Sequence, residues 1–127
     1  MKVAEIQISY NSKIPIAKRM KVTNSQHAYE IFLPKFEREM ELREMSYMML
    51  LNSNNRVKGI VYLGTGGTGG TVMDSIIILG TALKSLSNGI IMAHNHPSGN
   101  LTPSSTDIIT TRELQKSAKI MKMKLLH

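Results

Sequence analysis

Residues 89–99 read Gly-Ile-Ile-Met-Ala-His-Asn-His-Pro-Ser-Gly. The short apolar run at 89–93 predicts a buried strand. Pro97, Ser98 and the glycine that follows are turn formers, so the strand is expected to end there. Because alternate side chains of an extended segment share a face, His94 and His96 are predicted to point the same way.

A helix is expected to begin near Pro103, since proline is favoured at the first helical position and Thr102 can cap it. Ser104 and Asp107 are three residues apart, so they would lie on one face of the first turn. The strand end and the helix start therefore bring two imidazoles and one carboxylate towards a single point. A simpler interpretation, in which Asp107 only complements the helix dipole, stays open.

The sequence thus predicts a metal site made of His94, His96 and Asp107. Imidazole nitrogens and a carboxylate suit zinc, and three protein ligands leave a fourth position open for water. The chain has no cysteine to close a four-ligand structural site, so a catalytic metal is indicated. Iron, manganese or cobalt would also suit these ligands.

The pattern HNHPSGxxxPSxxD resembles the metal-binding motif of the JAMM (MPN-plus, or JAB-domain) metalloproteases, and in particular their bacterial RadC-like branch. The resemblance runs from about Glu44 to Leu126. It implies an α/β fold: a single MPN/JAB-like domain over residues 1–127, with a mixed β-sheet, flanking helices and cytidine-deaminase-like layering. It also implies zinc-dependent hydrolysis of peptide or isopeptide bonds, with a peptide or protein as substrate.

In that family a glutamate at the beginning of a hydrophobic strand acts as general base, and Glu44 is the matching residue here. Glu39 and Glu41 are alternatives if the register differs. The resemblance implies that Glu44 takes a proton from a metal-activated water and passes it to the leaving amine. Ser104 would stabilise the oxyanion, or would instead satisfy a backbone amide at the helix start.

Composition supports one globular domain, because 127 residues with 42% hydrophobic content can bury roughly two-thirds of the unfolded surface. No apolar run approaches the roughly 20 residues that span a membrane, and the first residues do not form a signal peptide. With no cysteine, a cytoplasmic protein is expected. Several methionines lie in apolar segments and are predicted to fill the core: Met48, Met49, Met73, Met92 and Met121.

The net charge of +7 raises the alternative of a nucleic-acid partner. The charge gathers in two clusters: Lys13, Lys18, Arg19 and Lys21, and then Lys116, Lys119, Lys122 and Lys124. No aromatic residue interleaves with either cluster along the sequence, so no stacking platform for single strands is predicted. The alternative function is a DNA-associated accessory module of the RadC (DNA repair) type, without peptidase activity.

Other metal-dependent chemistry fits less well. A zinc deaminase would need cysteine ligands, and the chain has none. Phosphodiester cleavage more often uses carboxylate-rich or two-metal sites.

Residues 1–40 are predicted to hold an edge strand at Val3–Tyr10 and a helix at Ser25–Phe36, which Pro34 breaks or ends. Residues 41–126 are predicted to form the metal-site core. This core begins with a hairpin of two strands, Met45–Leu51 and Val57–Leu63.

The glycine-rich segment Gly64–Thr71 lacks the ending of a phosphate-binding loop, and it is predicted to be flexible backbone where an extended substrate lies. Thr71-Val72-Met73-Asp74 resembles a capping box that opens a helix to about Leu86. The expected buried stripe of that helix consists of Ile76, Leu79, Leu83 and Leu86.

RadC-like proteins continue past Leu126 with an Asp-His pair and another hydrophobic strand. This chain ends at His127 and is therefore expected to lack the family's final strand, which would leave an unpaired edge.

Overall fold

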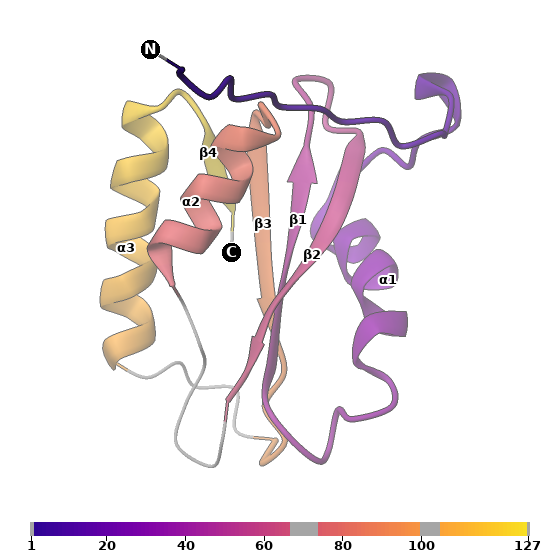
Figure 1. Ribbon diagram of the computed structural model, residues 1–127. Helices are drawn as coiled ribbons and strands as arrows, with labels where there is room; N and C mark the ends of the chain where they lie inside the picture. The colour runs from indigo at the N-terminus through magenta and orange to yellow at the C-terminus, as the bar shows by residue number, and fades with distance from the viewer. Residues whose placement is uncertain (1, 67–73, 100–104, 127) are drawn as a thin grey trace.

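The computed structural model describes residues 2–66, 74–99 and 105–126. Helix α1 lies on one face of a four-stranded sheet, and helices α2 and α3 lie on the other (Figure 1). In chain order the elements are the short 3-10 helix η1 (Ile16–Lys18), α1 (Ser25–Phe36), β1 (Met45–Leu51), β2 (Val57–Thr65), α2 (Ser75–Lys84), β3 (Gly89–His94), α3 (Ser105–Ile120) and β4 (Lys124–Leu126).

The sheet has the strand order β2-β1-β3-β4. Strand β1 pairs antiparallel with both β2 and β3, whereas β4 runs parallel to β3. The sheet is therefore mixed and flanked by helices, which confirms the predicted α/β class. Strand β4 was not predicted, because three residues are too few to carry a periodic signal. The predicted hairpin is confirmed, and β2 continues two residues further, to Thr65.

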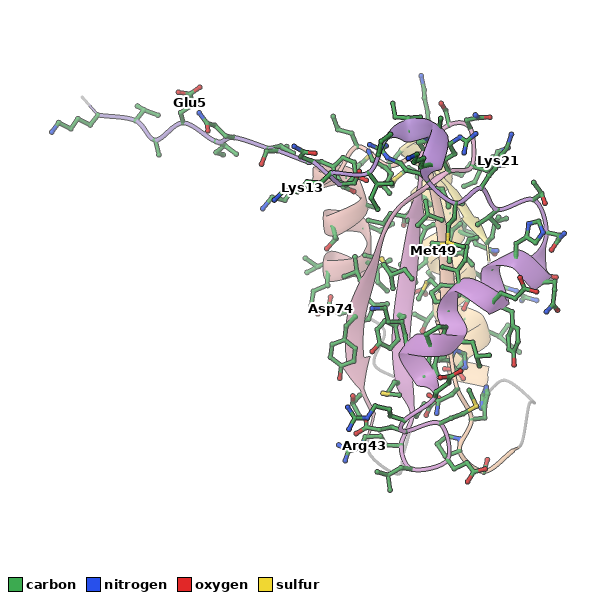
Figure 2. All side chains as sticks on the ribbon, turned by 90° about the vertical axis from the view of Figure 1, so that its right-hand side faces the viewer. Glu5, Lys13, Lys21, Arg43, Met49 and Asp74 are labelled. Atoms are coloured by element: carbon green, nitrogen blue, oxygen red, sulfur yellow. The ribbon has the colours of Figure 1, made fainter. Side chains whose placement is uncertain are left out.

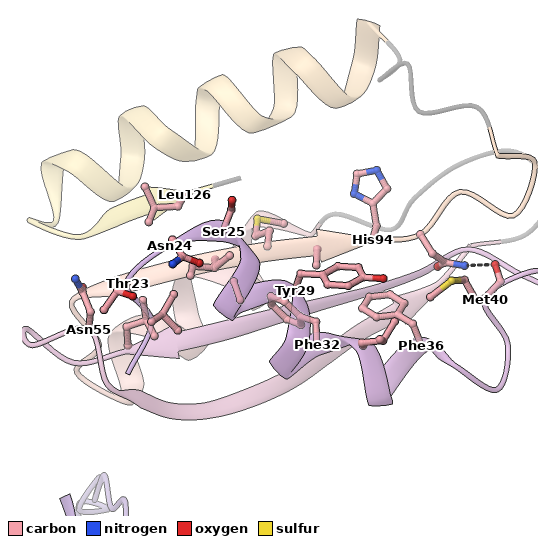
Figure 3. A pocket seen from close by; sticks show the side chains of 18 of the residues that line it. Thr23, Asn24, Ser25, Tyr29, Phe32, Phe36, Met40, Asn55, His94 and Leu126 are labelled. Atoms are coloured by element: carbon pink, nitrogen blue, oxygen red, sulfur yellow. Dashed lines mark hydrogen bonds between the residues drawn. The ribbon is translucent and has the colours of Figure 1, made fainter. Parts of the chain in front are cut away.

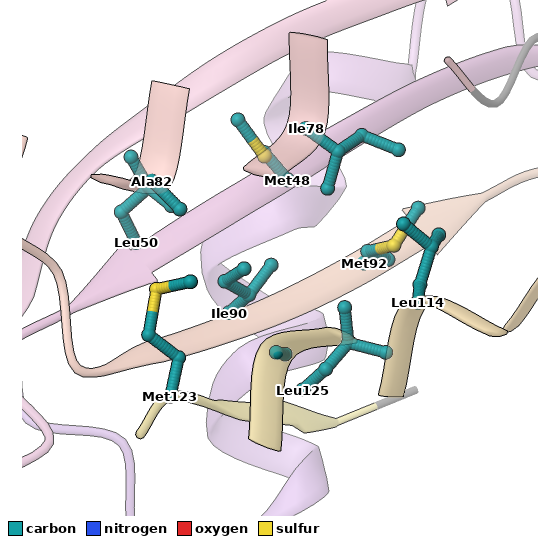
Figure 4. Packing of buried hydrophobic residues seen from close by; sticks show 10 residues of the cluster. Met48, Leu50, Ile78, Ala82, Ile90, Met92, Leu114, Met123 and Leu125 are labelled. Carbon is teal, nitrogen blue, oxygen red and sulfur yellow. The ribbon is translucent and has the colours of Figure 1, made fainter. Parts of the chain in front are cut away.

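Two apolar cores cover the two faces of the sheet, because successive residues of β1 point to opposite sides. Met48 and Leu50 face α2 and α3, and they pack with Ile78, Leu114 and their neighbours (Figure 4). Met49 and Leu51 face α1, where Phe32 and Phe36 cover them. Strand β1 is thus buried on both sides and forms the rigid centre of the domain.

Methionine supplies much of this core. Five thioethers are buried in the part of the chain that the structure describes, belonging to Met45, Met48, Met49, Met92 and Met123. The core placement of Met48, Met49 and Met92 is confirmed. Met121 is 53% exposed, so its predicted place in the core was wrong. It follows the last residue of α3, where the chain turns towards β4. Met73 lies outside the described residues.

The predicted edge strand at Val3–Tyr10 is absent from the described structure: these residues belong to no β-ladder and are exposed. The segment around Glu5 extends away from the sheet (Figure 2). Its apolar residues do not alternate strictly, and a strand exists only where a neighbouring strand accepts its hydrogen bonds. A mixture of apolar and polar residues therefore did not suffice to form a strand here.

Helix α1 forms over the predicted residues, but Pro34 neither breaks it nor ends it. The helix continues to Phe36, and the amide of Glu37 still donates to the Leu33 carbonyl at 3.2 Å. Pro34 has no N–H, so the helix loses one hydrogen bond, the one to the Glu30 carbonyl. The burial of Phe32 and Phe36 against the sheet favours a helical conformation in the last turn of α1.

Helix α2 begins later than predicted, at Ser75, with Asp74 as its N-cap. Thr71, the predicted cap, lies outside the described residues. The predicted buried stripe was largely wrong, since Ile76, Leu83 and Leu86 are exposed. The core instead receives Ile78 and Ala82, with Leu79 packed beside them. The first turn is apolar on every side, so periodicity could not tell which side the sheet would cover.

Replacing Asp74 by alanine is expected to lower the free energy of unfolding by about 1 kcal/mol. The Asp74 carboxylate accepts from the amides of Ile76 and Ile77, at 2.9 and 3.4 Å, and these donors lose their protein acceptor in the variant. Urea unfolding of wild type and Asp74→Ala measures the difference. Asp74→Asn is the control and should keep most of the stability, because its amide oxygen can still accept.

Several predictions concern residues that the structure does not describe. They are the substrate-bearing role of the part of Gly64–Thr71 beyond residue 66, the helix start at Pro103 with its Thr102 cap, and the placement of Ser104. The prediction of flexible backbone was wrong for Gly64 and Thr65, which belong to β2 and pair with β1. Within the described ranges, no helix is long and apolar enough to cross a membrane.

Candidate metal centre

The register between β1 and β3 brings the candidate residues together. Ser46 pairs with His94, and the amide of Asn95 donates to the Met45 carbonyl at 3.4 Å. Continuing this antiparallel register by one residue places Glu44 opposite His96. Residues about fifty positions apart in the chain therefore become neighbours through strand pairing alone.

These side chains share one face of the sheet. In β3, Ile90 and Met92 pack in the core that α2 and α3 cover, and His94 continues the same alternation. Figure 3 shows the His94 ring pointing to the α3 side of the sheet, whereas Phe32 and Phe36 lie on the α1 side. The predicted common orientation of the two histidines agrees with their separation, since their ring centroids are 4.6 Å apart.

Glu44, His94 and His96 form a compact donor group. One carboxylate oxygen and one nitrogen from each imidazole lie within 4.8 Å of one another, and all three residues are half-buried. Two nitrogens and one oxygen at this separation can converge on one divalent ion with small side-chain movements. The hydroxyl of Ser46, on the neighbouring strand, is buried and has no hydrogen-bond partner among the described residues. The group is thus chemically suited to a metal such as zinc.

Asp107 lies in the first turn of α3, as predicted, and is half-buried. Its carboxylate is not part of the compact group that holds the other three side chains. Strand pairing fixes Glu44 beside the histidines. The distance of Asp107 from them depends instead on where α3 packs against the sheet. Ser104 lies outside the described residues.

The two alternative glutamates lie elsewhere. Glu39 makes an ion pair with Arg43 at 3.6 Å, and Glu41 is exposed. Neither belongs to the compact donor group. Of the three candidate glutamates, the structure brings only Glu44 to the histidines.

Asn95 holds the approach to Glu44 in place, and sequence reasoning missed this residue. Its side-chain oxygen accepts from the Met45 amide at 2.7 Å, and its amide nitrogen donates to the carbonyls of Met40 and Arg43 at 2.8 and 2.9 Å. Figure 3 shows the bond to Met40. Asn95 alternates with the histidines, so it points to the other face and binds the chain on both sides of Glu44. The sequence feature that could have identified Asn95 is its position between the two histidines.

A cavity of about 640 Å³ lies next to the donor group. Tyr29, Phe32 and Phe36 of α1 line it, and His94 and His96 form part of its wall. This size and this apolar lining with a few polar groups are typical of ligand pockets. The two candidate histidines therefore border a space whose lining is largely apolar.

Comparison with known proteins identifies one family over most of the chain. The family described as "RadC-like JAB domain" matches residues 22–127. Its match covers α1, all four strands, α2 and α3, and with them every candidate metal ligand.

Several curated relatives carry the name UPF0758 protein. The one from Flavobacterium johnsoniae is 33% identical over 111 residues, which are 87% of this chain and 48% of the relative. Those from Porphyromonas gingivalis and Staphylococcus carnosus are 35% and 36% identical, and each alignment covers 85% of this chain and 47% of the relative. The chain thus spans about half the length of the curated relatives it matches.

Proposed function

Because the chain belongs to the RadC-like JAB domain family, we propose that it is a metal-dependent hydrolase that cleaves peptide or isopeptide bonds. The observation that carries this proposal is the compact group of Glu44, His94 and His96, built by strand pairing. Two imidazoles and one carboxylate are the donor set of hydrolytic zinc sites, and a further carboxylate beside such a site can serve as the general base.

His94 and His96 would hold the ion, with Asp107 of α3 as the third protein ligand. Zinc is the metal that fits the imidazole and carboxylate donors best, although other divalent ions suit them too. When bound, zinc polarises a carbonyl oxygen and makes water acidic enough to attack near neutral pH. The remaining chemistry falls to the chain's own side chains.

Glu44 is proposed as the general base. Its carboxylate lies beside the histidines, so it can accept a proton from the attacking water and then deliver that proton to the leaving amine. Asn95 binds the backbone before and after Glu44, so it limits how far this carboxylate can move. The cavity beside His94 and His96 offers room for the substrate's apolar side chains.

Metal content and turnover together test the proposal. Wild-type protein should bind about one zinc and should hydrolyse fluorescein-labelled casein, or a glycyl-glycine isopeptide on a lysine ε-amine. His96→Ala should lose both zinc and activity. Glu44→Gln should keep the zinc and lower kcat by about 10²–10⁴-fold, because only proton transfer is removed.

Glu39→Gln is the matched control, since it removes a nearby carboxylate that lies outside the donor group; it should keep zinc and activity. Loss of zinc in Glu44→Gln would make Glu44 a ligand and overturn its role as base. Zinc-loaded wild type that cleaves neither amide probe would overturn the hydrolase proposal.

A further inference from the structure

A second charged site lies at the end of the sheet opposite the metal centre. The segment before α1 is fastened to the β1–β2 hairpin, because Val22 donates to the Asn55 carbonyl and Val57 donates to the Met20 carbonyl. Arg56 also donates from Nη1 to the Arg19 carbonyl at 2.8 Å. These bonds bring cations from the N-terminal segment and from the hairpin together, at the opposite end from the start of β1 (Figure 1).

The Tyr10 ring lies within cation–π distance of two of these cations. The Arg19 guanidinium carbon is 5.6 Å from the centre of the Tyr10 ring, and the Lys58 ammonium nitrogen is 4.9 Å from it. The Tyr10 hydroxyl donates to the Lys58 carbonyl, which fixes the ring against β2. An aromatic ring therefore does interleave with the basic residues, in space and not along the sequence.

The cation group, defined as Arg19, Arg56 and Lys58, is not neutralised by acidic side chains. Among the described residues, none of the three has a carboxylate oxygen within 4.0 Å. Burial lowers the pKa of Lys58, and the nearby charge of Arg19 lowers this pKa further. Like charges held together without a counter-charge favour an incoming anion.

The two arginines have donors to offer such an anion. Arg19 uses its Nε–H on the Ile14 carbonyl at 3.2 Å, and Arg56 uses Nη1 on the Arg19 carbonyl. Each guanidinium has five N–H donors in a planar fork that matches phosphate oxygens. Both arginines are half-buried, so their positions are restrained without being closed to solvent.

We propose that Arg19, Arg56 and Lys58 form a phosphate-binding site that holds the backbone of a nucleic acid. A polymer is favoured over a single phosphate because the positive surface continues beyond the cation group. Lys13, Lys18 and Lys21 are exposed on the same N-terminal segment, and Figure 2 shows Lys13 and Lys21 at this end of the molecule. Several cations in a row suit successive phosphates.

The test is binding of a fluorescein-labelled oligothymidylate, followed by fluorescence anisotropy between about 50 and 200 mM salt. Arg19→Gln/Lys58→Gln should weaken binding at least about tenfold, and should flatten the salt dependence of log K by about 1.4, for two lost contacts to a single strand. Arg19→Gln alone should give about half the change in slope. This second variant guards against misfolding, because Lys58 also donates to the Ser85 carbonyl at 2.6 Å.

Lys116→Gln/Lys119→Gln is the matched control, since it removes the same charge from exposed positions on α3. Equal weakening by both double variants, or equal competition by polyglutamate, would show general charge attraction and overturn the site. If inorganic phosphate binds at the cation group but the oligonucleotide does not, the proposal that a nucleic acid supplies the phosphates is overturned. Neither the binding affinity nor its salt dependence requires a bound metal or hydrolytic activity.

Discussion

Replacing Asn95 by alanine is expected to lower the free energy of unfolding by about 2–4 kcal/mol and to remove most of the proposed hydrolytic activity. The Asn95 side chain makes three hydrogen bonds, to the backbone of Met40, Arg43 and Met45. The bond from the Met45 amide is buried, so its donor cannot turn to water when the acceptor is removed. The variant therefore leaves a buried amide without a partner.

Urea unfolding measures the loss of stability, and hydrolysis of the labelled substrate measures the loss of activity. Asn88→Ala is a matched control at the other end of β3, because Asn88 is exposed; it should change stability by less than about 0.5 kcal/mol. Asn95→Asp keeps the acceptor for Met45 but loses both donors, so its stability should be intermediate. If Asn95→Ala unfolds like wild type, the residue does not hold the strand start in place.

Activity should fall more in Asn95→Ala than zinc content does. The proposed metal ligands His94 and His96 belong to β3 and its end, whereas the position of Glu44 depends on the segment that Asn95 fastens. A looser segment lets the Glu44 carboxylate leave the donor group without removing the ligands. Equal loss of zinc and turnover would instead indicate that the whole end of the sheet has collapsed.

The Leu114→Ala variant is expected to lose about 2–5 kcal/mol of stability, through lost burial and the cavity left behind. Leu114 is 1% exposed and packs in the core between α3 and the sheet. The same helix carries Asp107 in its first turn, so a loosened α3 should also weaken zinc binding. The stability loss follows from packing alone, and the metal effect follows only if Asp107 is a ligand.

Glu113→Ala is the neighbouring control, because Glu113 is exposed on the same helix. It should leave both stability and zinc affinity nearly unchanged. Chemical denaturation gives the first quantity, and competition with a zinc chelator gives the second. Unchanged zinc affinity in a destabilised but folded Leu114→Ala protein would argue against Asp107 as a ligand.

Local patterns predicted much of the fold. The hairpin of β1 and β2, the apolar strand before His94 and the helix at Ser25–Phe36 all formed where the sequence placed them. Each is a continuous segment whose own residues specify its geometry. The shared face of the two histidines also followed from strand alternation, and the resemblance carried by their motif agrees with the matched family.

Contacts between distant segments were not predictable in this way. Packing against the sheet determines which face of α2 is buried, because Ile76, Ile77 and Ile78 offer an apolar side chain in every direction. The bonds of Asn95 to Met40, and of Tyr10 to Lys58, join residues more than forty positions apart. No local pattern marks such pairs.

The methionine-rich core has a consequence for oxidative damage. Met20 and Met121 are exposed and open to peroxide in the folded chain, whereas Met48 and Met49 are fully buried in β1. Conversion of a buried thioether to a sulfoxide places a polar group in an apolar core and opposes refolding. An oxidant therefore damages the surface without harm to the fold, but a single sulfoxide formed in β1 during a transient opening makes that opening hard to reverse.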